Sequence, residues 1–386
     1  MVEPPLASAD TSDTRVGIHW LPGSARDAAR RGWAGLEERL GEQALACSWD
    51  WTGTWLDHYG DVVPHRFAVG VVDGDPCGIA LVTEGVGRKR GPFRVHSVHL
   101  GTAGELPGES VFVEYNAVFV DSDHRRDFAI ALLRDLRWEP EWDEIALDGF
   151  EPDAAQPFLR AEPLLDAQRL PCPVVNLGEI RSSQGDVIGA FTRHTRWKVR
   201  RSLRGLGDVD MEWAETLDHA FEILDELIEL HQARWRSLGE PGAFASPRFV
   251  DFHRSLISTL LPRNRVVLFR VRAAGGTVGC LYGFVDRSRL LHYQSGLASY
   301  SDRQIRPIFV TCALCMQECL DRGLAEFDFM VGDSPHKQEL STATRELVWA
   351  TGRRPALRWR AMDALAAGRR WVRARRGSRR SPSSEA

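Results

Sequence analysis

Lysine is scarce in this chain, although positive charge is not. The 386 residues include 49 Lys and Arg residues, of which only Lys89, Lys198 and Lys337 are lysine. Arginine is a planar fork that is always charged, whereas lysine is a compact cation whose pKa shifts readily. Lys337 follows a short apolar run and the turn-forming residues 332–335. It is therefore either a solvated turn residue or a cation kept for chemistry.

Long apolar runs are also missing. No stretch of eighteen apolar residues occurs, so we expect no transmembrane helix. Residues 1–15 carry acids and prolines before their first basic residue, and they lack the basic start and apolar centre of a secretory signal. We therefore expect a cytoplasmic protein whose residues 1–14 are disordered.

The cysteines are seven, an odd number that argues against a disulfide framework in a large cytosolic chain. Cys312, Cys315 and Cys319 are spaced so that they share one face of a helix. Because no fourth ligand lies at close spacing, we interpret them as a buried apolar stripe and expect no metal.

The length and composition indicate two globular domains. A chain of 386 residues exceeds what one core usually covers, and its 43% hydrophobic and 26% charged residues are ordinary for a globular protein. The polar, turn-rich residues 178–189 mark the predicted boundary. We predict an N-terminal domain over residues 15–180 and a C-terminal domain over residues 181–360.

The C-terminal end is strongly basic. From Arg353 onward the chain has eleven arginines and two acidic residues, which give a net charge of +9. Residues 361–386 are therefore interpreted as a basic tail. Such a tail either contacts an anionic membrane surface or nucleic acid, or is a solvated terminus.

The two halves share one order of predicted elements. Runs 66–72 and 78–83, joined by Asp-Gly, predict a hairpin, and runs 265–271 and 278–285 predict another. In each half a further strand, a helix and a final strand follow, so duplication of an α/β unit is the economical explanation. The other expected strands are 111–120, 144–147, 174–177, 209–213, 290–294 and 326–330, and the expected helices are 26–40, 125–138, 153–159, 190–206, 217–238, 247–261 and 307–322.

The second half resembles a known family. The residues that carry the resemblance are His231–Gly239 at a helix end, Leu291–Gly296 at a strand end, and Arg322–Phe329 followed by Gly332 and Lys337. They are similar to the GNAT-type acyltransferase domain of the CelD/BcsL cellulose-biosynthesis-associated proteins, which are relatives of the FemAB aminoacyltransferases. The resemblance covers about residues 190–350 and is weaker before them.

The resemblance implies an α/β fold of tandem duplicated GNAT-like domains, with mixed twisted sheets flanked by helices and the donor cleft in the second domain. It implies an N-acyltransferase that moves an acyl group from acetyl-CoA, another acyl-CoA or another acyl thioester to an amine of a sugar, peptide or related metabolite. Two alternatives stay open, namely a FemAB-like transferase that uses aminoacyl-tRNA and a non-catalytic binding module in polysaccharide assembly. The oligomeric state is left open.

The expected donor loop departs from the usual GNAT pattern. GNAT enzymes wrap the donor pyrophosphate with a glycine-containing loop that opens a helix, but residues 301–307 contain no glycine. Arginine side chains are candidates to replace these contacts by bidentate phosphate binding. The predicted donor-binding residues are Gln294, Arg303, Gln304, Arg306 and Gly332, and an acyl donor other than acetyl-CoA stays open.

Acyl transfer to an amine requires a base and a group that stabilises the oxyanion. Asp328 lies between Phe327 and Phe329 in a predicted strand, so its carboxylate faces the opposite side and is either a base or a structural carboxylate. Lys337 is the candidate cation for an oxyanion or a phosphate. Tyr293 is a candidate general acid or channel residue, with a buried core tyrosine as the alternative.

Polar residues interrupt the predicted strand 111–120. Glu114, Tyr115 and Asn116 are consecutive there, and buried polar groups need either partners or a cleft. They form either an acceptor-binding wall between the two halves or a packed network.

The stretch 193–204 contains six cations and no acid. Arg196 and Arg200 are candidates to contact a phosphate of a nucleotide-linked substrate, or a tRNA if the donor is aminoacyl-tRNA. A solvated helix face is the alternative, and nucleic acid is not otherwise expected as a partner.

Overall fold

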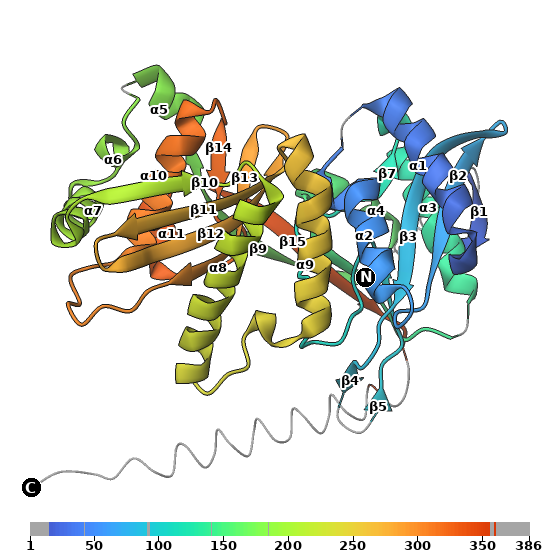
Figure 1. The fold of residues 1–386 in the computed structure, drawn as a ribbon. Helices are drawn as coiled ribbons and strands as arrows, with labels where there is room; N and C mark the ends of the chain where they lie inside the picture. The colour runs from blue at the N-terminus through green and yellow to red at the C-terminus, as the bar shows by residue number, and fades with distance from the viewer. Residues whose placement is uncertain are drawn as a thin grey trace, which may run out of the picture.

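The computed structural model describes residues 15–355 and Trp359, apart from residues 42, 91–92, 140 and 184. The predicted disorder of residues 1–14 and the predicted basic tail over residues 361–386 lie outside the described residues. Within the described part, thirteen strands form one twisted sheet with helices on both faces (Figure 1). No helix in this part combines the length and apolar character that crossing a membrane needs.

The first half runs from β1 to β9. Its main elements are β1 (Gly17–Pro22), α1 (Arg26–Leu40), α2 (Trp49–Tyr59), β2 (His65–Val72), β3 (Asp75–Glu84), β6 (Ser97–Leu100), α3 (Arg125–Trp138), β8 (Glu144–Phe150), α4 (Pro152–Ala161) and β9 (Leu165–Asn176). The short strands β4 (Lys89–Arg90), β5 (Phe93–Arg94) and β7 (Phe119–Val120) accompany them.

Three helices, α5 (Leu177–Ser183), α6 (Val187–Ala190) and α7 (Arg193–Leu206), lead into the second half. The second half contains β10 (Val209–Trp213), α8 (Leu217–Ser237), α9 (Pro247–Leu260), β11 (Val266–Ala273), β12 (Gly276–Asp286), β13 (Arg289–Leu297), α10 (Pro307–Asp321), β14 (Glu326–Asp328), α11 (Pro335–Leu340) and β15 (Ala343–Arg353). From β10 onward, this order of main helices and strands repeats that of the first half. The predicted tandem α/β fold is confirmed.

Local sequence explains where several elements turn or end. Asp73 and Gly74 have φ of 52° and 94°, the left-handed conformation that a tight two-residue hairpin between β2 and β3 requires. Gly323 follows α10 with φ of 89°, a conformation that glycine adopts at low cost after a helix. Thr192 caps α7, since its side chain accepts a hydrogen bond from the Thr195 N–H.

Helices bury both faces of the sheet. Helices α1, α2, α8 and α9 share one apolar cluster that spans the two halves, within which the Trp51 ring packs 5.5 Å from the Phe252 ring. On the opposite face α3 and α4 cover the first half, and α10 covers the second. The stripe formed by Cys312, Cys315 and Cys319 is buried in the α10 cluster.

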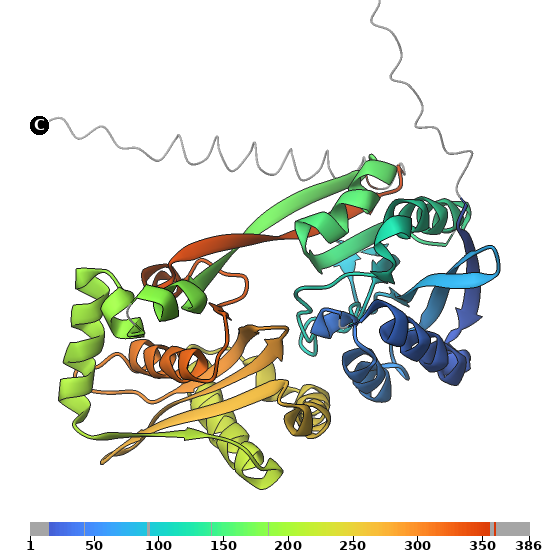
Figure 2. The ribbon, with the colours of Figure 1, turned by 90° about the horizontal axis from the view of Figure 1, so that it is seen from above.

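The last strand of each half pairs with the sheet of the other half. Strand β9 lies beside β14, strand β15 lies beside β8, and the two pair antiparallel with each other from Leu165 to Val174. Figure 2 shows these two long strands running together between the halves. Each half therefore completes its sheet with a strand from the other. The boundary at residue 180 stays a prediction.

Several segments differ from the sequence predictions. Strands β1, β6 and β15 were not expected, and β9 begins at Leu165 rather than at Val174. The strand expected over residues 111–120 is reduced to β7, because Phe112 and Tyr115 have φ of 44° and 57°, which a strand cannot hold. The sequence predicted only a turn before Lys337, but helix α11 begins there at Pro335. Proline suits the first position of a helix, because the N–H that it lacks would have no partner within the helix. The turn-rich boundary segment contains α5 and α6.

Candidate active site between the two halves

Strands β13 and β14 separate close to the junction of the halves. These parallel strands pair only over Arg289–Leu291 and Glu326–Asp328, although β13 continues to Leu297. Two residues after Asp328, Met330 has φ of 58°, a conformation that non-glycine residues rarely adopt. Backbone strain of this kind clusters at functional sites. The chain therefore leaves the sheet abruptly at residues 328–332.

In the first half, the corresponding parallel strands β6 and β8 also diverge, but a side chain fills the space between them. Asn116 is fully buried, and its Nδ2 donates to the Leu100 carbonyl of β6 at 2.8 Å and to the Asp148 carbonyl of β8 at 3.1 Å. Its backbone N–H donates to the Gly149 carbonyl at 3.0 Å. Asn116 thus fills the space between β6 and β8. The space between the two diverging strands is therefore filled in the first half, whereas no such side chain bridges β13 and β14 in the described part of the second half.

Tyr115 and Asp328 connect the two halves through a buried hydrogen bond. The Tyr115 hydroxyl donates to the Asp328 carboxylate, whose other oxygen accepts from the Met330 N–H at 2.6 Å. Asp328 is fully buried. Burial raises the pKa of Asp328 to about 6, although both hydrogen bonds favour the charged form. The Arg289 guanidinium lies 4.4 Å from the centre of the Tyr115 ring.

Glu114 and Lys337 meet at the backbone of Val331. The Glu114 carboxylate accepts from the Val331 N–H at 2.8 Å, and Lys337 Nζ donates to the Val331 carbonyl at 2.8 Å. Burial raises the pKa of Glu114 to about 7, and it lowers the pKa of Lys337. A Cβ on Gly332 would lie 3.1 Å from Lys337 Nζ, so glycine leaves room for the cation.

A cavity of about 680 Å³ lies mainly in the first half and reaches the junction with the second half at Val331 and Trp349. Glu114 and Val331 line it together with Leu170 of β9 and Trp349 of β15. Glu105 is a second carboxylate in its wall, and burial raises the pKa of Glu105 to about 7 while the Trp55 Nε1 donates to it at 2.5 Å. The lining therefore includes two carboxylates that titrate close to neutral pH.

Tyr293 and Gln294 lie on β13, where it has separated from β14. The Tyr293 hydroxyl donates to the Val111 carbonyl at 2.8 Å, which ties β13 to the first half. Its ring packs against His253 and Tyr282, and burial raises its pKa. Gln294 is half-buried.

Arg303, Gln304 and Arg306 lie at the start of α10, in a loop pinned to α7. The Arg306 N–H donates to Ser202 Oγ at 3.1 Å. The Ser202 hydroxyl in turn donates to the Gln304 carbonyl at 3.2 Å. A Cβ on Gly205 of α7 would lie 3.2 Å from the Ile305 side chain, so the helix approaches the loop closely. The side chains of Arg303, Gln304 and Arg306 are exposed.

The cations of α7 have different surroundings. Arg196 donates to the Gly189 carbonyl at 2.8 Å, whereas Lys198 is buried and pairs with Glu339. Arg200 is exposed. The predicted site residues therefore fall into four groups: the junction group Glu114, Tyr115, Asn116, Asp328, Gly332 and Lys337, the β13 pair Tyr293 and Gln294, the helix-start group Arg303, Gln304 and Arg306, and the α7 pair Arg196 and Arg200.

Two contributors to the junction group were missed from the sequence. Val331 acts through its backbone N–H and carbonyl, which give no side-chain signal. Arg289 is one of many arginines, and only the fold brings it over Tyr115. Among the described residues, no group of three or more His, Cys, Asp and Glu side chains is arranged to hold a metal ion.

Comparison with known proteins identifies the second half. Residues 190–338 match the acetyltransferase (GNAT) domain family. No curated protein matches the sequence. The CelD/BcsL assignment is finer than this match and stays a prediction.

Solved structures share the fold across both halves. The chain is similar to FemX, at 12% identity and a TM-score of 0.54, over 83% of this chain and 95% of that one. It is similar to the C-terminal domain of a proposed lysylphosphatidylglycerol synthetase from Agrobacterium fabrum, at 13% identity and a TM-score of 0.52, over 84% and 92% of the two chains. It is also similar to L-PGS from Bacillus licheniformis, at 11% identity and a TM-score of 0.50, over 87% and 95%.

Likenesses at such low identity show the fold alone, whereas the domain match covers the half in which β13 and β14 separate. The chain is therefore an acyltransferase whose residues 190–338 match the acetyltransferase (GNAT) domain family, and its two halves repeat one α/β order of elements.

Proposed function

We propose that the protein is an N-acyltransferase that moves an acyl group from an acyl-CoA, or from another acyl thioester, to an amine of a sugar, peptide or related metabolite. The observation that carries this proposal is Glu114. Its carboxylate lines the 680 Å³ cavity at the junction with the second half, accepts a hydrogen bond from the Val331 N–H, and has a pKa of about 7. A general base works best when its pKa lies near the working pH.

In the proposed reaction, ionised Glu114 takes a proton from the acceptor ammonium group. The free amine attacks the thioester carbonyl carbon, and a C–N bond forms. The C–S bond then breaks, and the leaving thiolate receives the second proton that the attacking nitrogen loses, so that an amide and a free thiol result. Lys337 supplies positive charge beside the reacting carbonyl, since its Nζ lies 2.8 Å from the Val331 carbonyl oxygen of the same turn.

Tyr115 and Asp328 are proposed as positioning residues. Asp328 was the base suggested by the sequence, but it is fully buried and accepts hydrogen bonds from Tyr115 and the Met330 N–H. Asp328 therefore fixes the backbone of residues 330–331. This backbone orients Glu114 through the Val331 N–H. Tyr293 and Gln294 are proposed to line the donor channel along the separated part of β13.

The donor phosphates are proposed to bind at the start of α10, where the positive end of the dipole of this fifteen-residue helix favours an anion. Arg303, Gln304 and Arg306 are exposed there and replace the missing glycines by side-chain contacts. Arg196 and Arg200 on the neighbouring helix are proposed to extend this basic surface toward further substrate phosphates.

A second candidate is transfer from aminoacyl-tRNA. The likeness in fold to FemX and to a proposed lysylphosphatidylglycerol synthetase favours it, as does the basic exposed face of α7. In this case the same helix-start group and the α7 pair would contact the tRNA backbone.

The test is a turnover assay with the full chain. Acyl-CoA thioesters of increasing chain length are combined with amino sugars and peptides, and free thiol and acylated product are followed by mass spectrometry. We expect thiol release that depends on the amine and resists ribonuclease. Turnover that occurs only with aminoacyl-tRNA and is abolished by ribonuclease would select the second candidate. Absence of turnover and binding with every thioester would reject acyl-CoA as donor.

A further inference from the structure

A second group of reactive side chains lies in the first half, outside the junction group. Ser97 and His99 are on β6, and Asp148 is on β8. The Ser97 hydroxyl lies 2.8 Å from His99 Nε2, and His99 Nδ1 lies 2.7 Å from the Asp148 carboxylate. Three side chains are thus joined in the order serine, histidine, aspartate.

The strand register produces this arrangement. Ser97 and His99 are two residues apart on β6, so they share one face of the sheet. His99 pairs in parallel with Ala146, and Asp148 is two residues further along β8, which places it on the same face. A carboxylate accepts only, so Nδ1 of His99 carries the proton and Nε2 is left to accept the proton of the Ser97 hydroxyl.

Gly85 makes the contact between Ser97 and His99 sterically feasible. A Cβ at this position would lie 2.2 Å from Ser97 Oγ and 2.9 Å from His99 Nε2. Any side chain here would therefore displace the hydroxyl or the imidazole, and glycine is needed for the close approach of the backbone.

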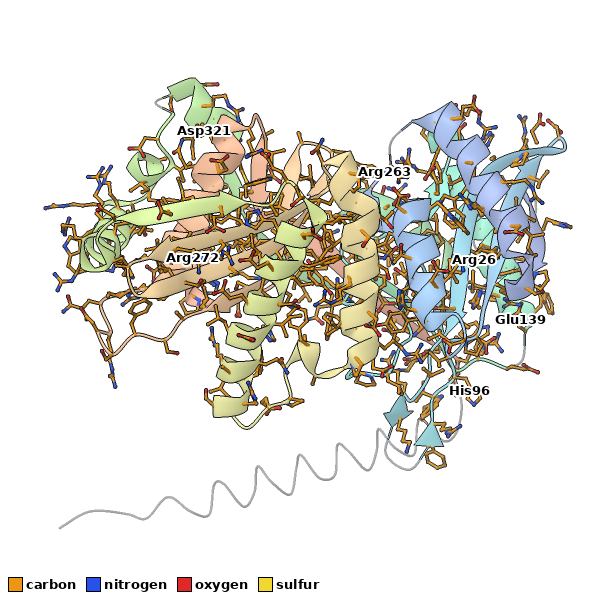
Figure 3. The ribbon with its side chains drawn as sticks, viewed as in Figure 1. Arg26, His96, Glu139, Arg263, Arg272 and Asp321 are labelled. Atoms are coloured by element: carbon orange, nitrogen blue, oxygen red, sulfur yellow. The ribbon has the colours of Figure 1, made fainter. Side chains whose placement is uncertain are left out.

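The three side chains border a cavity, although Ser97 and His99 are themselves buried. Ser97, His99 and Asp148 all line the 680 Å³ cavity that Glu114 lines, although Ser97 is only 1% exposed. Ser97 also lines a second cavity of about 770 Å³, whose wall includes His96 and Glu139. Figure 3 shows these two residues at the same end of the first half.

Arg88 lines both cavities beside Ser97. It pairs with Glu144 and its side chain is 43% exposed, which leaves the guanidinium accessible to a ligand. A cation that lines the same cavity as a nucleophilic serine is suited to stabilise the oxyanion of a tetrahedral intermediate.

We propose that Ser97, His99 and Asp148 form a second acyl-handling centre, in which Ser97 is acylated by an ester or thioester. Nε2 of His99 takes the hydroxyl proton as Ser97 Oγ attacks the carbonyl carbon. The C–O bond to Ser97 forms, the bond to the leaving alcohol or thiol breaks, and the leaving group receives the proton from His99. Water then attacks the acyl-serine with His99 again as base, which releases a carboxylic acid and restores Ser97.

This centre does not depend on the proposed amine transfer. Its three side chains all come from the first half, whereas the matched GNAT domain is in the second. The outcomes of the two proposals can therefore be separated with single variants of the full chain.

The test is covalent labelling. The full chain is incubated with a fluorophosphonate and, separately, with 4-nitrophenyl acetate, and the adduct is located by intact-mass and peptide mass spectrometry. We expect one adduct on Ser97 that is absent from Ser97→Ala. Asp148→Asn, which leaves His99 in the wrong tautomer, should slow labelling by about 100-fold or more.

Ser110→Ala is the matched control, because Ser110 lines the same cavity but its hydroxyl accepts only from the Phe112 N–H. Its labelling should equal that of the unchanged protein. Failure of the folded unchanged protein to be labelled would overturn the proposal, as would an adduct that persists in Ser97→Ala. Thermal melting of each variant verifies that it is folded.

Discussion

At the scale of single residues, the junction between the halves depends on charged groups that have been taken out of water. Asp328 is fully buried and depends on one hydroxyl and one backbone N–H for stabilisation. Removing a partner from a buried charge leaves its desolvation cost uncompensated. The Tyr115 hydroxyl is therefore worth more than an ordinary buried tyrosine hydroxyl.

Tyr115→Phe should lower the free energy of unfolding by about 1–3 kcal/mol, because a hydrogen bond to a charged group is lost. Tyr293→Phe is the matched control, since that hydroxyl donates to a neutral carbonyl, and it should cost only about 0.5–1.5 kcal/mol. Urea unfolding followed by fluorescence measures both. Equal losses in the two variants would speak against a charged Asp328 at the junction.

At the scale of elements, the start of α10 is the proposed substitute for a glycine-containing donor loop. Its backbone is fixed by Ser202 of α7 rather than by the tight glycine turn that the GNAT pattern uses. The exposed arginines at this end are consequently expected to contribute binding rather than chemistry.

Changing both Arg303 and Arg306 to Ala should raise KM for the donor by about 10-fold while kcat changes little, since an exposed ion pair contributes up to about 1 kcal/mol and two of them are lost. The control is Arg322→Ala beyond the other end of α10, where the side chain pairs with Glu318. Steady-state kinetics at two salt concentrations measures the effect. A lowered kcat with unchanged KM would instead assign these arginines to the reacting centre.

The sequence predicted elements well where the pattern was local. Helix 125–138 was predicted with the bounds that the structure has, and the hairpins followed from Asp-Gly and Gly-Gly. It failed over residues 111–120, because the left-handed conformations of Phe112 and Tyr115 are imposed by tertiary contacts. The polar residues Glu114, Tyr115 and Asn116 in that apolar run predicted either an acceptor-binding wall or a packed network, and their role stays a prediction.

At the scale of the whole molecule, the two halves are joined by exchanged strands. The sequence indicated the duplication but could not reveal the exchange, because β9 and β15 have no local feature that selects between two equivalent sheets. With β9 removed, β14 would present an unpaired edge, and an unpaired edge promotes aggregation. The pairing of β9 with β15 also brings Leu170 and Trp349 into the cavity wall.

Residues 181–355 produced alone should therefore be insoluble or aggregated, since they lack β9. Co-production with residues 15–180 should restore a soluble complex, which size-exclusion chromatography and circular dichroism would detect. A folded, monomeric product from residues 181–355 alone would show that the exchanged strand is dispensable and that each half is an independent unit.

The central claim is that Glu114 is the base for acyl transfer at the junction, and the pH dependence of kcat/KM tests it most directly. Because the base must be ionised, kcat/KM should rise with pH and level off above about 7, the pKa of Glu114. Glu105 lines the same cavity and its pKa is also about 7, so Glu105→Gln is the control. This variant should keep the bend at about pH 7 in the plot of kcat/KM against pH. Glu114→Gln should lose the bend and about 10²–10⁴-fold in rate. A Glu114→Gln enzyme that retains both the bend and the rate would contradict the account.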